Sequence, residues 1–331
     1  MKLFLLILSI FTGEVAYLQM NKTNRVEDPA YLAKVLTGGL ESDKEKVRVI
    51  FRWITDNISY MVKSNQKIMA AGLASQKFLP EDIDDGSPLK SLNDRVAEGV
   101  LKKREAICNG YARLFSALCS HAGIQSEVIV GYARGGNSRS ASKFSVNHTW
   151  NTVFLDGRWQ LLDASWASGY ISRDRNEFIR DYDAKYFLSD PRFFITDHFP
   201  DDPRWTLLPD AEVPDEFRHT PFKQKSFAKY KIISFTPSTG VINARVGDTI
   251  LLELETGDEQ RDKQISPDCS VDSALFRYSS SWVFLKPAMS EKQSATTGQY
   301  KYIYPITSTE AKWLYLMYND DMVLRYRLNV K

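Results

Sequence analysis

Apolar positions in the first part of the chain recur with the spacing of α-helices. In DKEKVRVIFRWITDNISY, residues 43–60, they return every three or four positions and so share one helical face. Residues 91–103 read as a second helix and residues 109–121 as a third. Gly123 is expected to close the third helix in the left-handed conformation that glycine adopts most easily. We therefore predict a layer of amphipathic helices.

After residue 124 the pattern changes to that of β-strands. The runs SEVIVGYAR, HTWNTVFL and RWQLLDASW are short and rich in β-branched and aromatic residues. Asp156 and Gly157, between the last two runs, are a strong signal for a two-residue type I′ hairpin. Helices followed by an antiparallel sheet predict an α+β fold.

The last hundred or so residues are dense in strand signals. A stretch rich in Pro and acidic residues, 197–222, has no period and reads as a linker or a wrapped extension. Seven short strand-like runs follow it, TILLELE and WLYLMY among them, which is typical of an immunoglobulin-like β-sandwich. We predict a sandwich domain at 223–331, after an α+β domain with a C-terminal extension at 20–222.

The N-terminal segment, residues 1–19, has the pattern of an export signal. One Lys precedes nine mostly large apolar residues, Leu3 to Phe11, which is short for a membrane-spanning helix. The small residues that follow mark a cleavage site poorly. The segment predicts a secreted or periplasmic protein, and the alternative is a protein anchored to a membrane by an uncleaved N-terminal segment.

Length and charge narrow the classes of partner. The chain has 331 residues, 43% of them apolar, which is enough for two domains with sizeable cores. Its 43 basic and 41 acidic residues give a net charge of +2, without a long basic run. We therefore expect no nucleic-acid partner.

Two of the three cysteines lie on the third predicted helix and are expected to differ. Cys108 begins the helix, where free N–H groups and the helix dipole favour a thiolate. Cys119 lies three turns later among apolar residues and reads as core. About 16 Å of helix separates them, too far for a disulfide. Cys269, in a loop-like segment, is expected to be unpaired. Because no Cys or His spacing of the zinc type occurs, we expect neither a metal nor a cofactor.

A nucleophilic thiol needs a base and a group that orients the base. His148 opens one strand of the predicted hairpin, and Asp163 follows fifteen residues later on the other. Counting outward from the turn, position 148 faces position 165, so that Asp163 is one step away on the same face. Each residue alone has a structural alternative: a core Cys, a satisfied His, a capping Asp. Their combined order and geometry favour catalysis.

Three segments resemble the transglutaminase-like superfamily: FRWITDNISY, AICNGYARLFSALCSHAGI and NHTWNTVFLDGRWQLLDASW. The run at 185–208 resembles the segment that follows the core in the branch related to kyphoscoliosis peptidase. The resemblance spans about residues 30–210 and implies a papain/transglutaminase-like core, with Cys108 as nucleophile, His148 as general base and acid, and Asp163 as orienter. The superfamily includes cross-linking enzymes, peptidases and proteins without demonstrated chemistry.

The surroundings of the thiol suggest further candidates. The backbone N–H of Cys108 is one natural oxyanion donor. For a second donor we favour Tyr60, at the end of the first predicted helix, over Gln76, and the alternative for Tyr60 is an aromatic packed under the sheet. Trp150 and Trp166 flank His148 and Asp163 in sequence. Both are expected on strands, facing the site, with at least one lining a substrate cleft, and core packing is the alternative.

Together these features predict an exported thiol acyl-transfer enzyme of peptidase or protein cross-linking type, acting on protein or peptide amides. Cys108 would form a thioester that water or a Lys amine resolves. The alternative is a catalytically inactive transglutaminase-like protein that binds peptides or serves as a scaffold. In either case the C-terminal sandwich is a candidate surface for a protein partner or the cell envelope.

Overall fold

The computed structural model describes most of the chain. The described residues are 26–62, 90–134, 144–172, 176–209, 213–257, 281–287 and 298–331. The predicted N-terminal signal, Gln76 and Cys269 lie outside these ranges.

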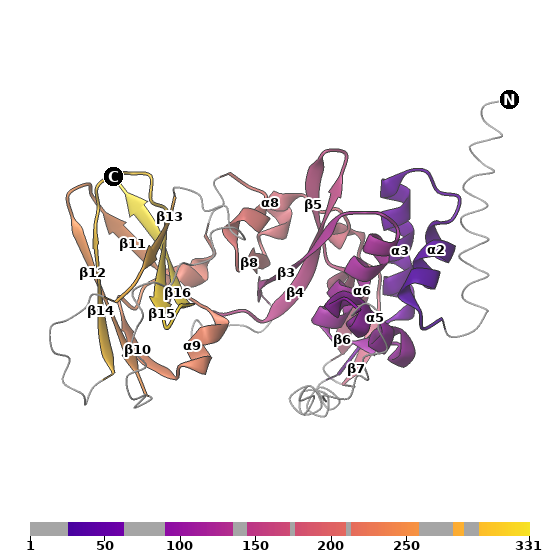
Figure 1. Cartoon of the computed structure of the whole chain (residues 1–331), viewed down its shortest axis with the longest axis horizontal. Helices are drawn as coiled ribbons and strands as arrows, with labels where there is room; N and C mark the ends of the chain where they lie inside the picture. Colours follow the sequence, from indigo (N-terminus) through magenta and orange to yellow (C-terminus); the bar gives the residue numbers. More distant parts are fainter. Residues whose placement is uncertain are drawn as a thin grey trace. The chain divides into compact units, whose positions relative to one another are not determined.

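The chain forms two compact units that interleave along the sequence (Figure 1). The first unit comprises 1–130, 148–195 and 202–209, and the second comprises 131–147, 196–201 and 210–331. The predicted domain boundaries at residues 19 and 222 stay predictions. Every residue of the proposed site belongs to the first unit.

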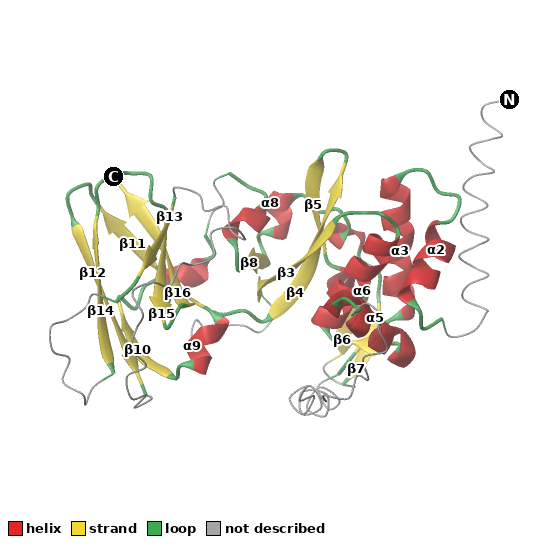
Figure 2. Ribbon diagram, viewed as in Figure 1, coloured by secondary structure: helices red, strands yellow, loops and turns green. Residues whose placement is uncertain are grey.

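Helices and strands both contribute to the first unit, as expected for an α+β fold (Figure 2). Its helices are α2 (Pro29–Thr37), α3 (Asp43–Asn57), α5 (Leu92–Lys103), α6 (Cys108–His121), α7 (Ala164–Ala167), α8 (Pro191–Phe194) and the 3₁₀ turns η2 (Ala184–Tyr186) and η3 (Pro203–Thr206). The predicted second helix is confirmed as α5 and the third as α6. Gly123 follows α6 with φ +75°, as predicted. Within the described residues, no helix combines the length and apolar character needed to cross a membrane.

Helix α6 is the centre of the first hydrophobic core. It contacts α2, α3, α5 and strand β4 (His148–Leu155). Its buried face includes Leu114, Phe115, Leu118 and Cys119, each fully shielded from solvent. Because α6 is packed on several sides, it buries far more apolar surface than a helix packed on one face. This burial stabilises the position of α6.

The first predicted helix ends earlier than expected. Helix α3 stops at Asn57, and Ser59–Tyr60 form strand β1, which pairs in parallel with β2 (Glu105–Ala106). The N–H of Ser59 donates to the Arg104 carbonyl at 2.9 Å, and the N–H of Met61 donates to the Ala106 carbonyl at 3.0 Å. These bonds to a distant segment replace the next helical bonds, so the prediction that Tyr60 ends a helix is wrong.

The predicted hairpin is confirmed. Strand β4 pairs antiparallel with β5 (Arg158–Leu162), in the register that sets Leu155 opposite Arg158. Asp156 and Gly157 have φ of 51° and 76°, the two positive values that a type I′ turn requires. On its other side β4 neighbours β3 (Ser126–Ala133).

The second strand of the hairpin ends sooner than predicted. Strand β5 stops at Leu162, and Asp163 caps the short helix α7 by accepting hydrogen bonds from the backbone N–H groups of Ser165 and Trp166. An aspartate at this position satisfies donors that a helix start leaves free. Trp166 therefore lies on a helix and not on a strand. The hairpin of β6 (Gly169–Ser172) and β7 (Glu177–Arg180) follows.

The second unit contains strands from three parts of the chain. The last residues of β3 pair with β8 (His198–Pro200). A three-stranded sheet has the order β10-β12-β14, and a five-stranded sheet runs β11-β16-β15-β13, with β9 also on β16. Their bounds are β9 (Phe222–Lys223), β10 (Ile232–Thr236), β11 (Val241–Ala244), β12 (Thr249–Thr256), β13 (Trp282–Leu285), β14 (Gln299–Pro305), β15 (Trp313–Tyr318) and β16 (Asp321–Val330), with η4 (Asp215–Arg218) and α9 (Lys225–Lys229) before β10. Side chains of both sheets share one hydrophobic core, with Leu252 and Tyr302 on one side and Leu314 and Tyr326 on the other.

Gly110 should not tolerate a larger side chain, because at this position α6 packs closely against Ala106 and Val100. A Cβ at Gly110 would lie 2.6 Å from the Ala106 Cβ and 3.0 Å from the Val100 Cγ2. We expect Gly110→Ala to lower the free energy of unfolding by about 1 to 3 kcal/mol through overpacking, measured by urea denaturation. The matched control is Gly99→Ala on α5, where no atom lies within 4 Å. Alanine there should stabilise by about 0.5 to 1 kcal/mol. Similar effects of both substitutions would contradict the close packing at Gly110.

Candidate active site

The two cysteines of α6 have opposite surroundings. Cys108 is the first residue of the helix and is half-buried, whereas Cys119 is fully buried in the core. Burial strongly raises the pKa of the Cys119 thiol, even though the Ser126 hydroxyl hydrogen-bonds to it. Cys119 therefore stays a neutral packing residue, as predicted, and Cys108 is the candidate for ionisation.

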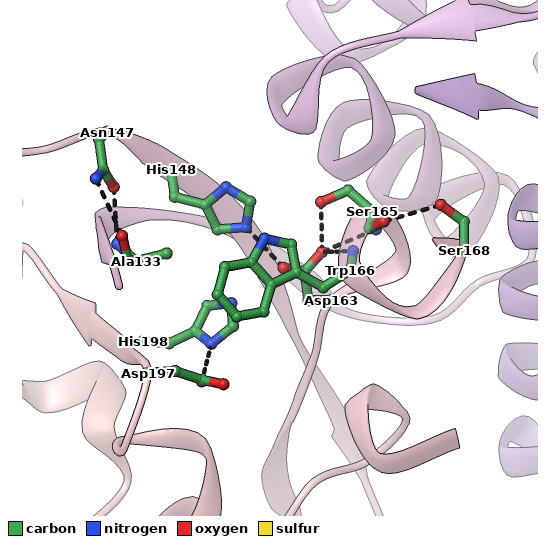
Figure 3. A network of polar contacts seen from close by, with 9 residues as sticks. All are labelled: Ala133, Asn147, His148, Asp163, Ser165, Trp166, Ser168, Asp197 and His198. Carbon is green, nitrogen blue, oxygen red and sulfur yellow. Dashed lines mark hydrogen bonds and ion pairs between the residues drawn. The ribbon is translucent and has the colours of Figure 1, made fainter. Parts of the chain in front are cut away.

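His148 and Asp163 meet as the predicted register requires. The His148 Nε2 lies 2.7 Å from the Asp163 Oδ2, and the two side chains are only 6% and 1% exposed (Figure 3). The other carboxylate oxygen, Oδ1, accepts hydrogen bonds from the Ser165 N–H at 2.8 Å, the Ser165 hydroxyl at 2.7 Å and the Trp166 N–H at 3.1 Å. Four donors thus hold one carboxylate, which fixes its orientation and favours its charged form.

His148 and Cys108 each shift the pKa of the other. Burial raises the pKa of the Cys108 thiol. The hydrogen bond and the charge of His148, together with the Thr149 N–H, lower this pKa by more, so the net shift is downward. For His148, burial lowers the pKa, while the charge and hydrogen bond of Asp163 and the contact with Cys108 raise it, and the net shift is upward. Because Asp163 holds Nε2, the ring nitrogen left to face the sulfur is Nδ1. The two pKa shifts favour the charged forms of both side chains.

Asn151 ties the strand of His148 to the helix of Cys108. Its buried amide donates to the carbonyl of Ala112 on α6 at 3.0 Å and to the carbonyl of Glu127 on β3 at 3.2 Å. Sequence reasoning missed this residue. The available signal was an amide side chain in the middle of a strand that lies in a buried sheet, where such a group needs partners.

Tyr60 lies beside Cys108, although not at the end of a helix. Its phenol is close enough to Cys108 for that residue to act on its pKa. Burial first, and then the charge of Cys108, raise the pKa of the Tyr60 phenol, so it keeps its proton. The Tyr60 ring packs 6.1 Å from the Tyr111 ring, centroid to centroid. Both the catalytic and the packing interpretation of Tyr60 thus describe part of its surroundings.

The two tryptophans differ in exposure. Trp150 is 1% exposed, with its ring 6.0 Å from both the His148 and the Phe194 rings, which matches the core-packing alternative. Trp166 is half-buried on α7, with its ring 5.4 Å from the His148 ring. The expectation that both lie on strands is wrong for Trp166. Its place in a substrate cleft stays a prediction.

The geometry can support nucleophilic chemistry at sulfur. His148 and Asp163 are also residue types that bind metals, but their facing atoms, Nε2 and Oδ2, are joined to each other at 2.7 Å. The His148–Asp163 pair is arranged as in a Cys-His-Asp triad, and Cys108 as the thiol of that triad stays a prediction.

Comparisons with known proteins agree with this arrangement. Residues 30–164 match the family model of the transglutaminase-like superfamily. Kyphoscoliosis peptidase of Mus musculus is 34% identical over 215 residues, which are 64% of this chain and 29% of the relative. Hillarin of Drosophila melanogaster is 28% identical over 238 residues, 65% of this chain and 26% of the relative. The chain therefore spans under a third of the length of these relatives.

A solved structure described as a TGase is 16% identical, with a TM-score of 0.26, and the match covers 54% of this chain and 37% of that one. The family match and the sequence relatives carry the assignment. Residues 30–164 of this chain form a transglutaminase-like domain, in the branch that includes kyphoscoliosis peptidase.

Proposed function

We propose that the chain is a thiol acyl-transfer enzyme, of peptidase or protein cross-linking type, that acts on protein or peptide amides. The observation that carries this proposal is the His148 ring, which is held by Asp163 at 2.7 Å and lowers the pKa of the Cys108 thiol. Perturbed groups in such a mutual arrangement are typical of catalytic sites. The relationship to a protein named a peptidase supports the same proposal.

The proposed reaction has two stages. The Cys108 thiolate attacks an amide carbonyl, and the carbon–sulfur bond forms as the carbonyl electron pair moves to oxygen. The C–N bond then breaks, the His148 imidazolium gives its proton to the departing amine, and a thioester remains. Water or a Lys amine, deprotonated by His148, attacks the thioester and releases Cys108. Asp163 keeps the ring oriented throughout.

Other parts of the chain support wider proposals. The two sheets of the second unit, with their shared core, support an immunoglobulin-like sandwich at 223–331. We propose that this sandwich binds a protein partner or the cell envelope. The pattern at 1–19 supports export to the exterior or periplasm, with an uncleaved anchor as the alternative.

A non-catalytic peptide-binding or scaffold protein is the second candidate. It is favoured by the structural role of Asp163, whose carboxylate caps α7 through Ser165 and Trp166 and would be needed without any catalysis. The two candidates differ in whether Cys108 forms a thioester. Mixing the protein with 4-nitrophenyl acetate tests this, because an enzyme should release a burst of nitrophenolate and carry an acetyl group on Cys108 by mass spectrometry. Adding a lysine derivative then distinguishes transfer to an amine from hydrolysis.

Replacing His148 should make Cys108 an ordinary buried thiol. In His148→Ala, burial is the largest influence left on the Cys108 pKa, and it acts upward. We expect alkylation by iodoacetamide at pH 6 to slow more than about tenfold, since each unit of pKa changes the thiolate fraction about tenfold. Rates measured between pH 5 and 9 would show the inflection moving to higher pH.

The matched control for this experiment is His121→Ala, since His121 ends the same helix and pairs with Asp94 at the surface. Its alkylation profile should match that of the wild type. Cys108→Ala gives the background from other thiols. An unchanged profile in His148→Ala would contradict the coupling of His148 to Cys108.

The two helix cysteines should respond oppositely to serine. Cys108→Ser should abolish thioester formation and turnover while leaving the melting temperature nearly unchanged, because imidazole cannot ionise a hydroxyl as it can a thiol. Cys119→Ser should destabilise the fold by about 1 kcal/mol, since it places a hydroxyl in the apolar core beside the Ser126 hydroxyl. The folded fraction of Cys119→Ser should keep its activity.

Both serine variants are compared in reducing buffer, by thermal unfolding and by the acetylation assay. Loss of activity in Cys119→Ser without loss of stability, or unfolding of Cys108→Ser, would reverse the assignment of the two residues.

A further inference from the structure

Helix α7 buries a serine hydroxyl that donates to the carboxylate of the proposed triad. The Ser165 hydroxyl lies 2.7 Å from the Asp163 Oδ1, and Ser165 is only 3% exposed (Figure 3). Within the described part of the chain, this is the one hydrogen bond of that hydroxyl. Ala164 and Ala167 are buried in the same helix, so alanine suits this environment. Packing of α7 alone therefore does not account for a hydroxyl at position 165.

The N-terminal cap of α7 does not need the hydroxyl either. An N-cap side chain ordinarily accepts a hydrogen bond from a backbone N–H of the first helical turn. The Asp163 Oδ1 already accepts from two such groups, the Ser165 N–H at 2.8 Å and the Trp166 N–H at 3.1 Å. The hydroxyl is a third donor to the same oxygen, and hydrogen bonds to a charged acceptor are strong. Its effect therefore falls on the carboxylate rather than on the start of α7.

The three bonds to Oδ1 determine where the other carboxylate oxygen points. Oδ2 lies 2.7 Å from the His148 Nε2. Asp163 is only 1% exposed, so water is not at hand to replace a donor that the carboxylate loses. A rotation that moved Oδ2 away from the ring would also stretch the bonds to Oδ1. The Ser165 hydroxyl thus restrains the carboxylate in the orientation in which it meets His148.

We infer that Ser165 is a positioning residue of the acyl transfer, whose hydroxyl keeps the Asp163 carboxylate directed at the His148 ring. This inference rests on the proposed function. In that reaction His148 gives a proton to the departing amine and takes one from the attacking water or amine, while Asp163 stays ionised. The hydroxyl keeps its own proton throughout and acts only through Asp163. The part of Asp163 in raising the pKa of His148 agrees with a carboxylate held in this way.

The test compares two buried serines, one in α7 and one at its C-terminal end. Ser165→Ala removes the donor to the carboxylate and keeps both backbone donors of the cap. Ser168→Ala, the matched control, removes a hydroxyl that donates to the Ser165 carbonyl at 2.8 Å and not to Asp163. In Ser165→Ala we expect the inflection of Cys108 alkylation by iodoacetamide to move up by about half to one pH unit, because a less firmly held Asp163 supports the His148 imidazolium less. Ser168→Ala should keep the wild-type profile.

Two further measurements separate positioning from stability. Ser165→Ala should slow the nitrophenolate burst of Cys108 about tenfold, because a ring that is held less firmly transfers protons less well. Its melting temperature should fall no more than that of Ser168→Ala. Ser165→Thr, which keeps the hydroxyl, should restore both the alkylation profile and the burst.

Each other outcome rejects the inference. An unchanged profile in Ser165→Ala would show that the hydroxyl does not act on the triad, and an equal change in Ser168→Ala would trace the effect to the stability of α7. Unfolding of Ser165→Ala would show that the hydroxyl serves the fold, and a folded Ser165→Thr that behaves like Ser165→Ala would exclude the hydroxyl as the cause. If the wild-type protein alkylates at pH 6 but never acetylates on Cys108, the proposed function fails, whereas the alkylation profiles still show whether Ser165 positions Asp163.

Discussion

The site depends on a fixed spacing between helix α6 and strand β4, because Cys108 lies on one and His148 on the other. The Asn151 amide maintains this spacing by donating to carbonyls on both α6 and β3. The bond to Ala112 is buried, so breaking it would leave a polar group without water, at a cost of about 1 to 3 kcal/mol. Packing of α6 on several sides then prevents the helix from shifting. The hydrogen bonds of Asn151 set the position of α6 relative to β4, and the apolar core maintains it.

The electrostatics of the triad follow from this spacing. Burial by itself works against both charges, since it raises the pKa of Cys108 and lowers that of His148. The net pKa shifts nevertheless favour both charges, because each group acts on the other and Asp163 raises the pKa of His148. The same burial that penalises an isolated ion strengthens the attraction between the pair.

Local signals in the sequence were sufficient for several features. Asp156 and Gly157 determine a two-residue turn, and the turn alone sets the register that brings His148 and Asp163 together. Features that depend on distant segments were predicted wrongly. Residues 58–60 continue an apolar helical pattern, and only pairing with β2, far along the chain, makes Tyr60 part of a strand. The short helix after Asp163 interrupts a strand-like run, although an Asp two residues before a Ser can signal a cap. Asn151 was missed because its importance lies in carbonyls that the sequence does not reveal.

Asp163 serves two purposes that selection cannot separate. It orients His148 with one oxygen and caps α7 with the other, so a descendant that had lost all chemistry would still need it to fold. Cys108 is half-buried at a helix start, and the hydrogen bond and charge of His148 lower its pKa. Among diverging copies of this domain, position 108 should drift first and position 163 last. An aspartate at position 163 therefore does not indicate that a related domain is catalytically active. The residue at position 108, at the start of α6, is the better indicator of activity.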